Sequence, residues 1–212
     1  MSYETAKQFW TNRKSYPKYP NLNERRLIDV NFVINNINNP KSLLDIGCGD
    51  GYLIRVLREL TSIEAFHGND LSEKLVKNFQ DNWGKSMNSS LTLSTGSIFD
   101  NVILPTDVTL SMGSLLYIFG ANNLHKLVSM LKSDMFIVRS PCTLKEVDEY
   151  IDVYSDQLKS KYSAVYRTVK TYLDVFKSFY KYVEVTKAYP DEIESKYGTK
   201  HFYFVCNKKD CI

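Results

Sequence analysis

The chain has 212 residues, 43% of them hydrophobic and 24% charged, which suits one well-cored globular domain but not two ordinary ones. Its 27 basic and 24 acidic residues give a net charge of only +3, and their dispersed pattern argues against a nucleic-acid partner. No run reaches the ~20 apolar residues of a membrane helix, the first residues lack a signal-peptide pattern, and the cysteines lack metal-ligand spacing. We therefore expect a cytoplasmic protein with reduced thiols and no bound metal.

Residues 1–40 are predicted to form an N-terminal helical segment ahead of the main domain, 41–212. Asn23 can cap a helix whose apolar face is formed by Leu27, Val30, Ile34 and Ile37. Before this helix, two Tyr-Pro pairs favour an extended path. The aromatic residues there either pin the segment to the domain or line a ligand site as part of a lid. The candidates for ligand contact in this segment are Trp10, Arg13, Tyr16 and Tyr19.

The stretch 43–52 predicts a buried strand, a tight glycine turn and the start of an amphipathic helix. Apolar residues lead to Asp45, and three glycines then follow at every second position, Gly47, Gly49 and Gly51. Glycine lets the backbone turn sharply and lets a ligand lie directly against it. Amides exposed at the start of the helix would attract a negatively charged group.

The spacing of these glycines distinguishes between nucleotide-binding motifs. A dinucleotide fingerprint needs a further glycine where this chain has Tyr52, and the Gly-Lys-Ser/Thr of a phosphate-binding loop is absent. The remaining pattern, Asp-x-Gly-x-Gly-x-Gly, resembles the first motif of class I S-adenosylmethionine-dependent methyltransferases. The resemblance continues through 66–72, which looks like that family's second strand ending in an acid, Asp70, with Ser72 capping the next helix.

The resemblance implies S-adenosylmethionine as the cofactor. An acid at Asp70 can accept hydrogen bonds from both ribose hydroxyls, and amides of the glycine turn would meet the methionyl carboxylate. By resemblance, Asp45 holds the ammonium side, and Leu71 and Ile98 enclose the adenine. Ser97 stands where many relatives carry an Asp. The implied cofactor residues are Asp45, Gly47, Cys48, Gly49, Gly51, Asp70, Leu71, Ser97, Ile98, Met112 and Gly113.

The rest of the chain alternates predicted strands and helices. The expected elements are strands at 91–94, 107–111 and 135–139, helices at 122–131, 144–160 and 163–180, and closing strands at 183–189 and 202–206. This order predicts an α/β fold: a Rossmann-like, mostly parallel sheet with helices on both faces. The resemblance implies seven strands, a terminal antiparallel pair, and a helical insert at about 143–180 that covers the acceptor.

Residues just past each strand are the candidates for acceptor contact, because ligands lie at the carboxyl ends of parallel strands. Tyr117 could point its hydroxyl toward the acceptor or could be a core tyrosine, and His125 has the rough location of a base. Arg139 would suit an anionic acceptor or could form a structural salt bridge. Arg167 is a further candidate for acceptor contact, with a solvent-facing side chain as the alternative.

The sequence thus favours a methyltransferase of the EC 2.1.1 class that acts on oxygen or nitrogen of a small polar acceptor. In its overall features the chain is similar to small bacterial enzymes that modify surface polysaccharides or their nucleotide-linked precursors, so the acceptor could be phosphorylated or sugar-linked. A tRNA or protein methyltransferase and a non-catalytic S-adenosylmethionine-binding regulatory module remain the alternatives. We expect a monomer or homodimer with a small-molecule partner, and neither nucleic acid nor a membrane.

Overall fold

The computed structural model describes residues 3–12, 21–84, 86, 90–155, 160–194 and 198–208. Three expected ligand contacts, Arg13, Tyr16 and Tyr19, lie outside this part of the chain. Among the described residues no helix is both long and apolar enough to cross a bilayer. The same residues contain no cluster of three or more His, Cys, Asp or Glu side chains arranged to hold a metal ion.

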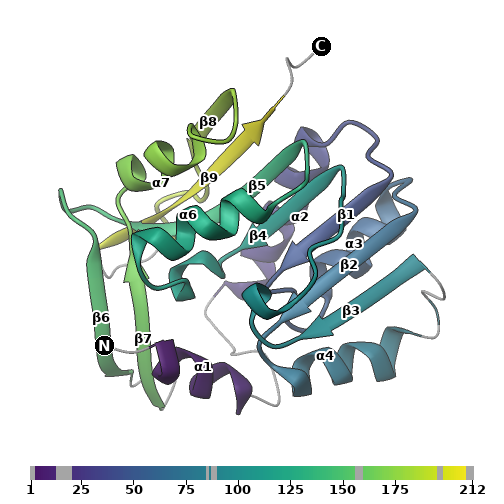
Figure 1. Cartoon of the computed structure of the whole chain (residues 1–212), viewed down its shortest axis with the longest axis horizontal. Coiled ribbons are helices and arrows are strands. Elements are labelled where there is room, and N and C mark those ends of the chain that lie inside the picture. Colours follow the sequence, from purple (N-terminus) through teal and green to yellow (C-terminus); the bar gives the residue numbers. More distant parts are fainter. Residues whose placement is uncertain are drawn as a thin grey trace.

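A seven-stranded sheet forms the centre of the molecule, with strand order β3-β2-β1-β4-β5-β9-β8 (Figure 1). The first five strands in this order are parallel, whereas β9 runs antiparallel to both β5 and β8. The predicted fold class is therefore confirmed. The strands are β1 (Ser42–Ile46), β2 (Ala65–Asp70), β3 (Leu91–Thr95), β4 (Val108–Met112), β5 (Met135–Thr143), β8 (Tyr182–Lys187) and β9 (Thr199–Asn207).

Helices cover both faces of the sheet, so its central strands are buried on both sides. In β1, Leu43 packs with the helices of one face and Leu44 with those of the other. In Figure 1, α6 and α7 lie in front of the sheet and α2 and α3 behind it. The helices are α1 (Tyr3–Thr11), α2 (Leu22–Asn36), α3 (Tyr52–Leu60), α4 (Glu73–Phe79), α6 (Ala121–Met130) and α7 (Val169–Phe176), with short turns η1 (Gln80–Gly84), η3 (Ile98–Asp100) and η4 (Leu115–Tyr117).

The region expected to be a helical insert is built differently. Instead of a helix over 144–160, β6 (Glu149–Ser155) and β7 (Ser160–Tyr166) form a separate antiparallel pair. Both segments are rich in β-branched and aromatic residues, which favour strands. The second helix, α7, begins only after Thr168, whose side chain accepts a hydrogen bond from the amide of Thr171.

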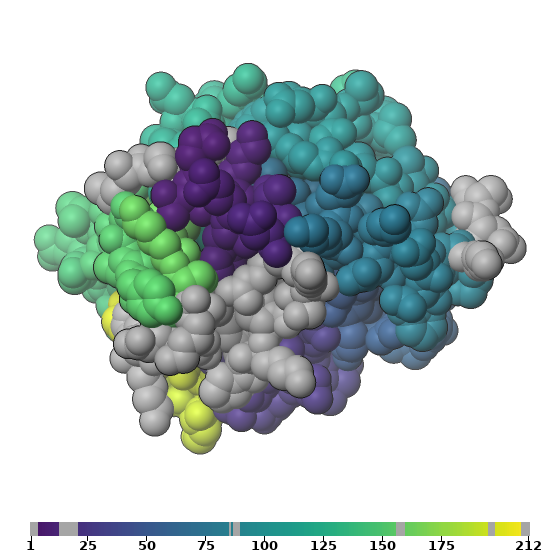
Figure 2. Space-filling view, turned by 90° about the horizontal axis from the view of Figure 1, so that it is seen from below, coloured from purple at the N-terminus to yellow at the C-terminus, as the bar shows by residue number. Residues whose placement is uncertain are grey.

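The β6–β7 hairpin and α1 lie side by side below the sheet. Figure 1 shows α1 next to β7, and Figure 2, seen from below, shows the dark purple α1 between the light green β7 and the blue-teal part of the chain. Contacts between α1 and β7 agree with this arrangement. The two elements thus cover the edge at which β1, β2 and β4 end.

Candidate functional site

Two adjoining cavities lie at the carboxyl ends of the parallel strands. The Asp70 cavity, of about 80 Å³, follows β2 and includes Leu71 and Ile98 in its lining. The Arg139 cavity, of about 240 Å³, lies toward β5 and is also lined by Asp45. Both cavities share the walls formed by Trp10, Gly47, Met112, Gly113 and Tyr117. This is the edge at which open parallel sheets bind ligands.

The glycine turn after β1 is tied to β2 by its own amides. The amides of Gly47 and Cys48 donate to the carbonyl of Asn69 at 2.7 and 3.1 Å, and the amide of Gly49 donates to Oδ2 of Asp70 at 2.9 Å. The amide of Gly51 donates to the Cys48 carbonyl. Acceptors within the protein therefore already use these four amides, and contact between amides of the turn and an anionic ligand group stays a prediction.

Gly47 is required where the turn meets the end of β4. Its φ of +81° is in the left-handed region, and a Cβ there would lie 2.4 Å from Cβ of Ser114. Ser114 donates through Oγ to the carbonyl of Ile46 at 2.6 Å. The absent side chain therefore allows the turn and the β4 loop to form one continuous wall shared by both cavities.

Asp70 has a carboxylate whose capacity to accept hydrogen bonds is only partly used by the protein. Its Oδ1 accepts from the amide of Ser72 at 2.8 Å and its Oδ2 from Gly49. Burial raises the pKa of Asp70, while these two amides oppose the rise. Each carboxylate oxygen can accept more than one hydrogen bond. Asp70 can therefore still receive two hydroxyl groups from a ligand in its cavity.

Asp45 is buried, and its Oδ1 has no hydrogen-bond partner among the described residues. Burial, together with the smaller effect of the nearby charge of Asp70, raises the pKa of this carboxyl to about 7. A buried acceptor without a donor is costly. The arrangement is therefore suited to a ligand that brings a cationic donor into the Arg139 cavity.

Away from its acid, the Asp70 cavity is mostly apolar but also includes Asn69 and Ser114 in its lining. Leu71, Ile98 and Ile118 contribute to its lining. Ser97 also borders it, but its Oγ accepts a hydrogen bond from the amide of Phe99 and so caps η3. The cavity thus combines one carboxylate with mostly apolar, aliphatic and aromatic, walls, which suits a flat ring attached to a polyhydroxyl group.

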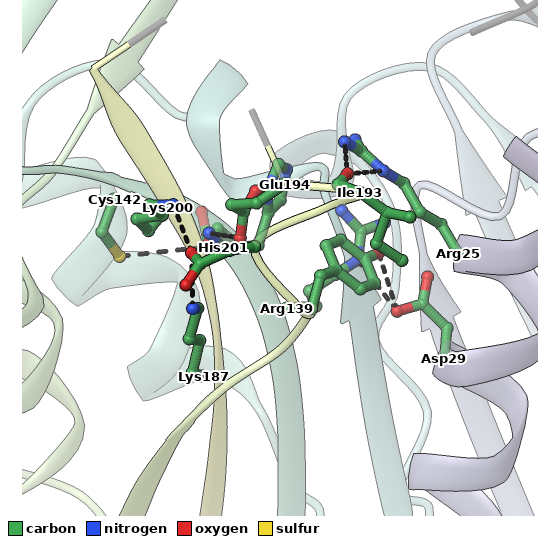
Figure 3. A network of polar contacts seen from close by, with 12 residues as sticks. Arg25, Asp29, Arg139, Cys142, Lys187, Ile193, Glu194, Lys200 and His201 are labelled. Carbon is green, nitrogen blue, oxygen red and sulfur yellow. Dashed lines mark hydrogen bonds and ion pairs between the residues drawn. The ribbon is translucent and has the colours of Figure 1, made fainter. Parts of the chain in front are cut away.

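Arg139 lines the Arg139 cavity, and its positive charge is compensated by an acid. Its Nε lies 3.2 Å from Oδ1 of Asp29 (Figure 3). Its Nη2 donates to the carbonyl of Met112 at 2.9 Å. The same oxygen of Asp29 accepts from the hydroxyls of Tyr189 and Tyr203 at 3.0 and 2.7 Å. The structural salt bridge is therefore present, and Arg139 still lines the cavity.

Tyr117 lies in η4 and lines both cavities, surrounded by aromatic rings. Its ring centroid is 5.3 Å from that of Trp10 and 6.3 Å from that of Tyr162, with edge-to-face geometry in both pairs. The hydroxyl of Tyr162 lies 3.1 Å from that of Tyr166, and burial raises the pKa of Tyr162. Trp10 and Tyr117 are thus brought together, as expected for residues at a ligand site.

Two other expected site residues lie elsewhere. His125 is exposed on α6 and packs against Phe179, with ring centroids 4.6 Å apart, and it lines neither cavity. Arg167 is buried and donates to the carbonyls of Leu115 and Gly120 at 3.1 and 3.4 Å and also to that of Ile118. Its guanidinium therefore binds the backbone next to η4 rather than an acceptor.

The cavities also contain residues that the sequence analysis did not identify. Asp29 is an acid on the inward face of α2, a signal that the amphipathic pattern of 22–36 could have provided. Tyr162 belongs to β7 and was missed because its segment was expected to be a helix. Neither residue lies close in sequence to the glycine turn.

The chain matches no family model and no curated protein sequence. It resembles solved structures. A geranyl diphosphate C-methyltransferase from Streptomyces coelicolor A3(2) matches with a TM-score of 0.70, 9% identity, and 98% of each chain covered. A Listeria monocytogenes protein, provisionally assigned as an S-adenosylmethionine-dependent methyltransferase, matches with a TM-score of 0.68 and 18% identity over 89% of this chain and 100% of that one.

A third match is phosphoethanolamine N-methyltransferase 2 from Haemonchus contortus, with a TM-score of 0.63 and 14% identity over 89% of this chain and 53% of that one. At these identities the likeness concerns the fold. The chain has the Rossmann-like fold of class I S-adenosylmethionine-dependent methyltransferases.

Proposed function

We propose that this protein is an S-adenosylmethionine-dependent methyltransferase. The observation that carries the proposal is a pair of acids beside the glycine turn, Asp45 in the last part of β1 and Asp70 at the end of β2. Asp45 has an unsatisfied buried oxygen at the Arg139 cavity, and Asp70 has spare acceptor capacity at the adjoining Asp70 cavity. An amino acid joined to an adenosine through sulfur requires these two groups at adjoining positions.

The residues present fit this cofactor. Asp45 would hold its ammonium group, Asp70 its ribose hydroxyls, and Leu71, Ile98 and Ile118 its adenine. Bound there, the cofactor supplies a methyl group on a positively charged sulfur. The chain itself has to place the acceptor atom in line with that methyl group, and such alignment supplies a large part of the rate enhancement.

Aromatic residues would exclude water from the site and orient the acceptor. Trp10 and Tyr117 border both cavities, and Tyr162 borders the Arg139 cavity. Because burial raises the pKa of Tyr162, its phenol stays protonated near neutral pH and acts as a hydrogen-bond donor rather than a base. In this proposal Tyr117 contacts the acceptor, and Arg139, held by Asp29, contacts a polar group of the acceptor.

For the acceptor we propose a small polar molecule that is methylated on oxygen or nitrogen. Three arginines, Arg25, Arg26 and Arg139, line the Arg139 cavity, which supports a phosphorylated or sugar-linked acceptor. Two of the structural neighbours are named for phosphorylated acceptors, geranyl diphosphate and a phosphoethanolamine. A place in the biosynthesis of polysaccharide or capsule precursors rests only on the resemblance of the sequence.

Calorimetry with S-adenosylhomocysteine tests the cofactor part of the proposal. We expect binding at micromolar concentrations, and we expect Asp70→Asn to weaken it at least about tenfold, because hydrogen bonds to a charged acceptor contribute roughly 1.5–3 kcal/mol. Asp100→Asn, at an exposed acid of η3, is the matched control and should leave binding unchanged. Wild-type protein that does not bind the nucleoside would refute the proposal.

A further inference from the structure

A third depression adjoins the Arg139 cavity on the outer side of the glycine turn. This Trp83 recess, of about 170 Å³, shares Arg26, Asp50 and Tyr52 with the Arg139 cavity and adds Arg55 and Trp83 to its lining. None of the roles proposed above uses Arg55 or Trp83. The recess and the Arg139 cavity therefore adjoin along these three residues.

Guanidinium groups and aromatic rings alternate along the wall of the recess. The guanidinium carbon of Arg26 lies 4.5 Å from the ring centroid of Tyr52. That of Arg55 lies 5.6 Å from the same centroid and 4.3 Å from the centroid of Trp83. A guanidinium held over a ring keeps its N–H groups at its own edge, where they match the oxygens of a phosphate.

The arginines of the recess, Arg26 and Arg55, and Arg139 of the adjoining cavity differ in how their charges are compensated. Nη2 of Arg26 contacts both carboxylate oxygens of Asp50, at 3.0 and 2.8 Å. Arg139 is paired with Asp29. Arg55 forms no ion pair with any carboxylate among the described residues and contacts only the two rings through its side chain. Within the described ranges, the recess therefore has one positive charge without a carboxylate partner, and that charge belongs to Arg55.

Among the arginines that line the Arg139 cavity, Arg25 is the one without a carboxylate partner in the described part of the chain. Its Nε donates to the carbonyl of Ile193 at 3.1 Å, and Nη2 donates to the same oxygen (Figure 3). Its guanidinium also lies 5.1 Å from the ring centroid of Tyr189. Two of its donor nitrogens are thus engaged by the backbone, whereas the guanidinium of Arg55 forms no hydrogen bond with any residue that the structure describes.

The walls of the recess are held in place by close packing. A Cβ on Gly51 would lie 2.4 Å from the ring of Phe79, so this glycine lets the start of α3 rest directly on the end of α4. Phe79 leads into the π-helical turn η1, which carries Trp83. Such turns often occur at functional sites. The side chain of Trp83 is 37% exposed and so remains accessible to a ligand.

We propose that the Trp83 recess binds a phosphate group of the methyl acceptor, whose reacting atom lies in the Arg139 cavity. This inference rests on the proposed function, because the ligand of the recess is the acceptor of the proposed methyl transfer. Arg55 binds the phosphate oxygens, and Trp83 and Tyr52 hold its guanidinium in place. The acceptor then spans two adjoining sites, and Arg139 contacts an uncharged polar group of the acceptor within the Arg139 cavity.

Tryptophan fluorescence can report on the recess directly, because the chain has only two tryptophans, Trp10 and Trp83. In a Trp10→Phe variant the signal comes from Trp83. This protein would be titrated with ribose 5-phosphate, inorganic phosphate and ribose at constant ionic strength, with and without S-adenosylhomocysteine. We expect a saturable response to both anions and none to ribose.

Arg55→Gln and Arg58→Gln, each added to the Trp10→Phe protein, form a matched pair. Both residues lie on α3 and both changes remove one positive charge, but Arg58 is exposed and lies outside the recess. We expect Arg55→Gln to weaken binding of ribose 5-phosphate at least about tenfold, as for the loss of a charged hydrogen bond. Arg58→Gln should change it less than about twofold, as for a screened surface charge.

No saturable response to either anion would overturn the inference, and so would equal affinities of the Arg55 and Arg58 variants. Binding of S-adenosylhomocysteine is measured separately by calorimetry. If that binding fails while the anion titrations succeed, the proposed function is wrong and the phosphate site stands. The opposite pair of results removes the phosphate site and leaves the proposed methyl transfer intact.

Discussion

At the residue scale, Asp45 places a carboxyl in an environment that disfavours its charge. Its pKa of about 7 lies well above the ordinary value because of burial and the neighbouring Asp70. The folded state therefore binds this proton more tightly than the unfolded chain does. Between the unfolded value, near pH 4, and about pH 7, the contribution of Asp45 to stability falls as pH rises. A ligand ammonium would offset this loss.

The affinity for S-adenosylhomocysteine should consequently depend on pH. Below its pKa, Asp45 is protonated and loses its attraction for the ligand ammonium, so binding should weaken about tenfold from pH 8 to pH 6. Asp45→Asn should bind weakly at both pH values, with little change between them. Calorimetry at both pH values measures this, and a wild-type affinity as flat as that of the variant would contradict the role of Asp45.

At the element scale, the β6–β7 hairpin is connected to the wall of the site through Arg167. This buried side chain follows β7 and donates to three carbonyls around η4, those of Leu115, Ile118 and Gly120. The carbonyl of Arg167 in turn accepts from the amide of Thr143 at the end of β5. The hairpin, the end of β5 and the loop that carries Tyr117 are thus held as one unit.

Arg167→Lys should lower the free energy of unfolding by about 3 kcal/mol, because one ammonium cannot replace a fork that reaches several buried carbonyls. The affinity for S-adenosylhomocysteine should fall as well, since η4 borders both cavities. Urea unfolding and calorimetry measure the two effects. Lys170→Gln, on the exposed face of α7, should stay within about 0.5 kcal/mol of wild type. A similarly small effect of Arg167→Lys would show that the hairpin is not held in this way.

At the scale of the whole molecule, α1 covers the site from a distant part of the sequence. Trp10 borders both cavities, and Phe9 contacts Tyr162 of the hairpin, with ring centroids 6.2 Å apart. The surface of α1 is therefore shared between the ligand cavities and the hairpin (Figure 2). We infer that this helix acts as a cover for bound ligand.

Hydrogen exchange tests this inference. With S-adenosylhomocysteine at about ten times its dissociation constant, exchange of the amides in 3–12 should slow by up to about tenfold, if opening of α1 requires loss of the ligand. The amides of α6, which lies on the front face of the sheet, serve as an internal control and should be unaffected. Unchanged exchange in α1 despite saturation would exclude its role as a cover.

Local sequence determined the central parallel strands and the glycine turn, because their signals lie within a few consecutive residues. These signals are the strand periodicity, the spacing of Gly47, Gly49 and Gly51, and the acid that ends β2. Each can be recognised in the sequence without knowledge of any long-range contact. The placement of Asp45 and Asp70 beside one another followed from those signals, since neighbouring parallel strands end at the same edge.

Only the tertiary structure decided how the side chains are paired. The carboxylate of Asp29 forms an ion pair with Arg139, which lies 110 positions later in the chain. The guanidinium of Arg55 instead lies near two aromatic rings and has no carboxylate partner among the described residues. The β6–β7 hairpin forms where a helix was expected. It places Tyr162 in the lining of the Arg139 cavity and is followed by the buried Arg167. A short apolar segment is compatible with either a helix or a strand. The role of a charged side chain likewise depends on the partner that it meets in the folded chain. Contacts between distant residues settle both, because packing and desolvation act only once the chain is folded.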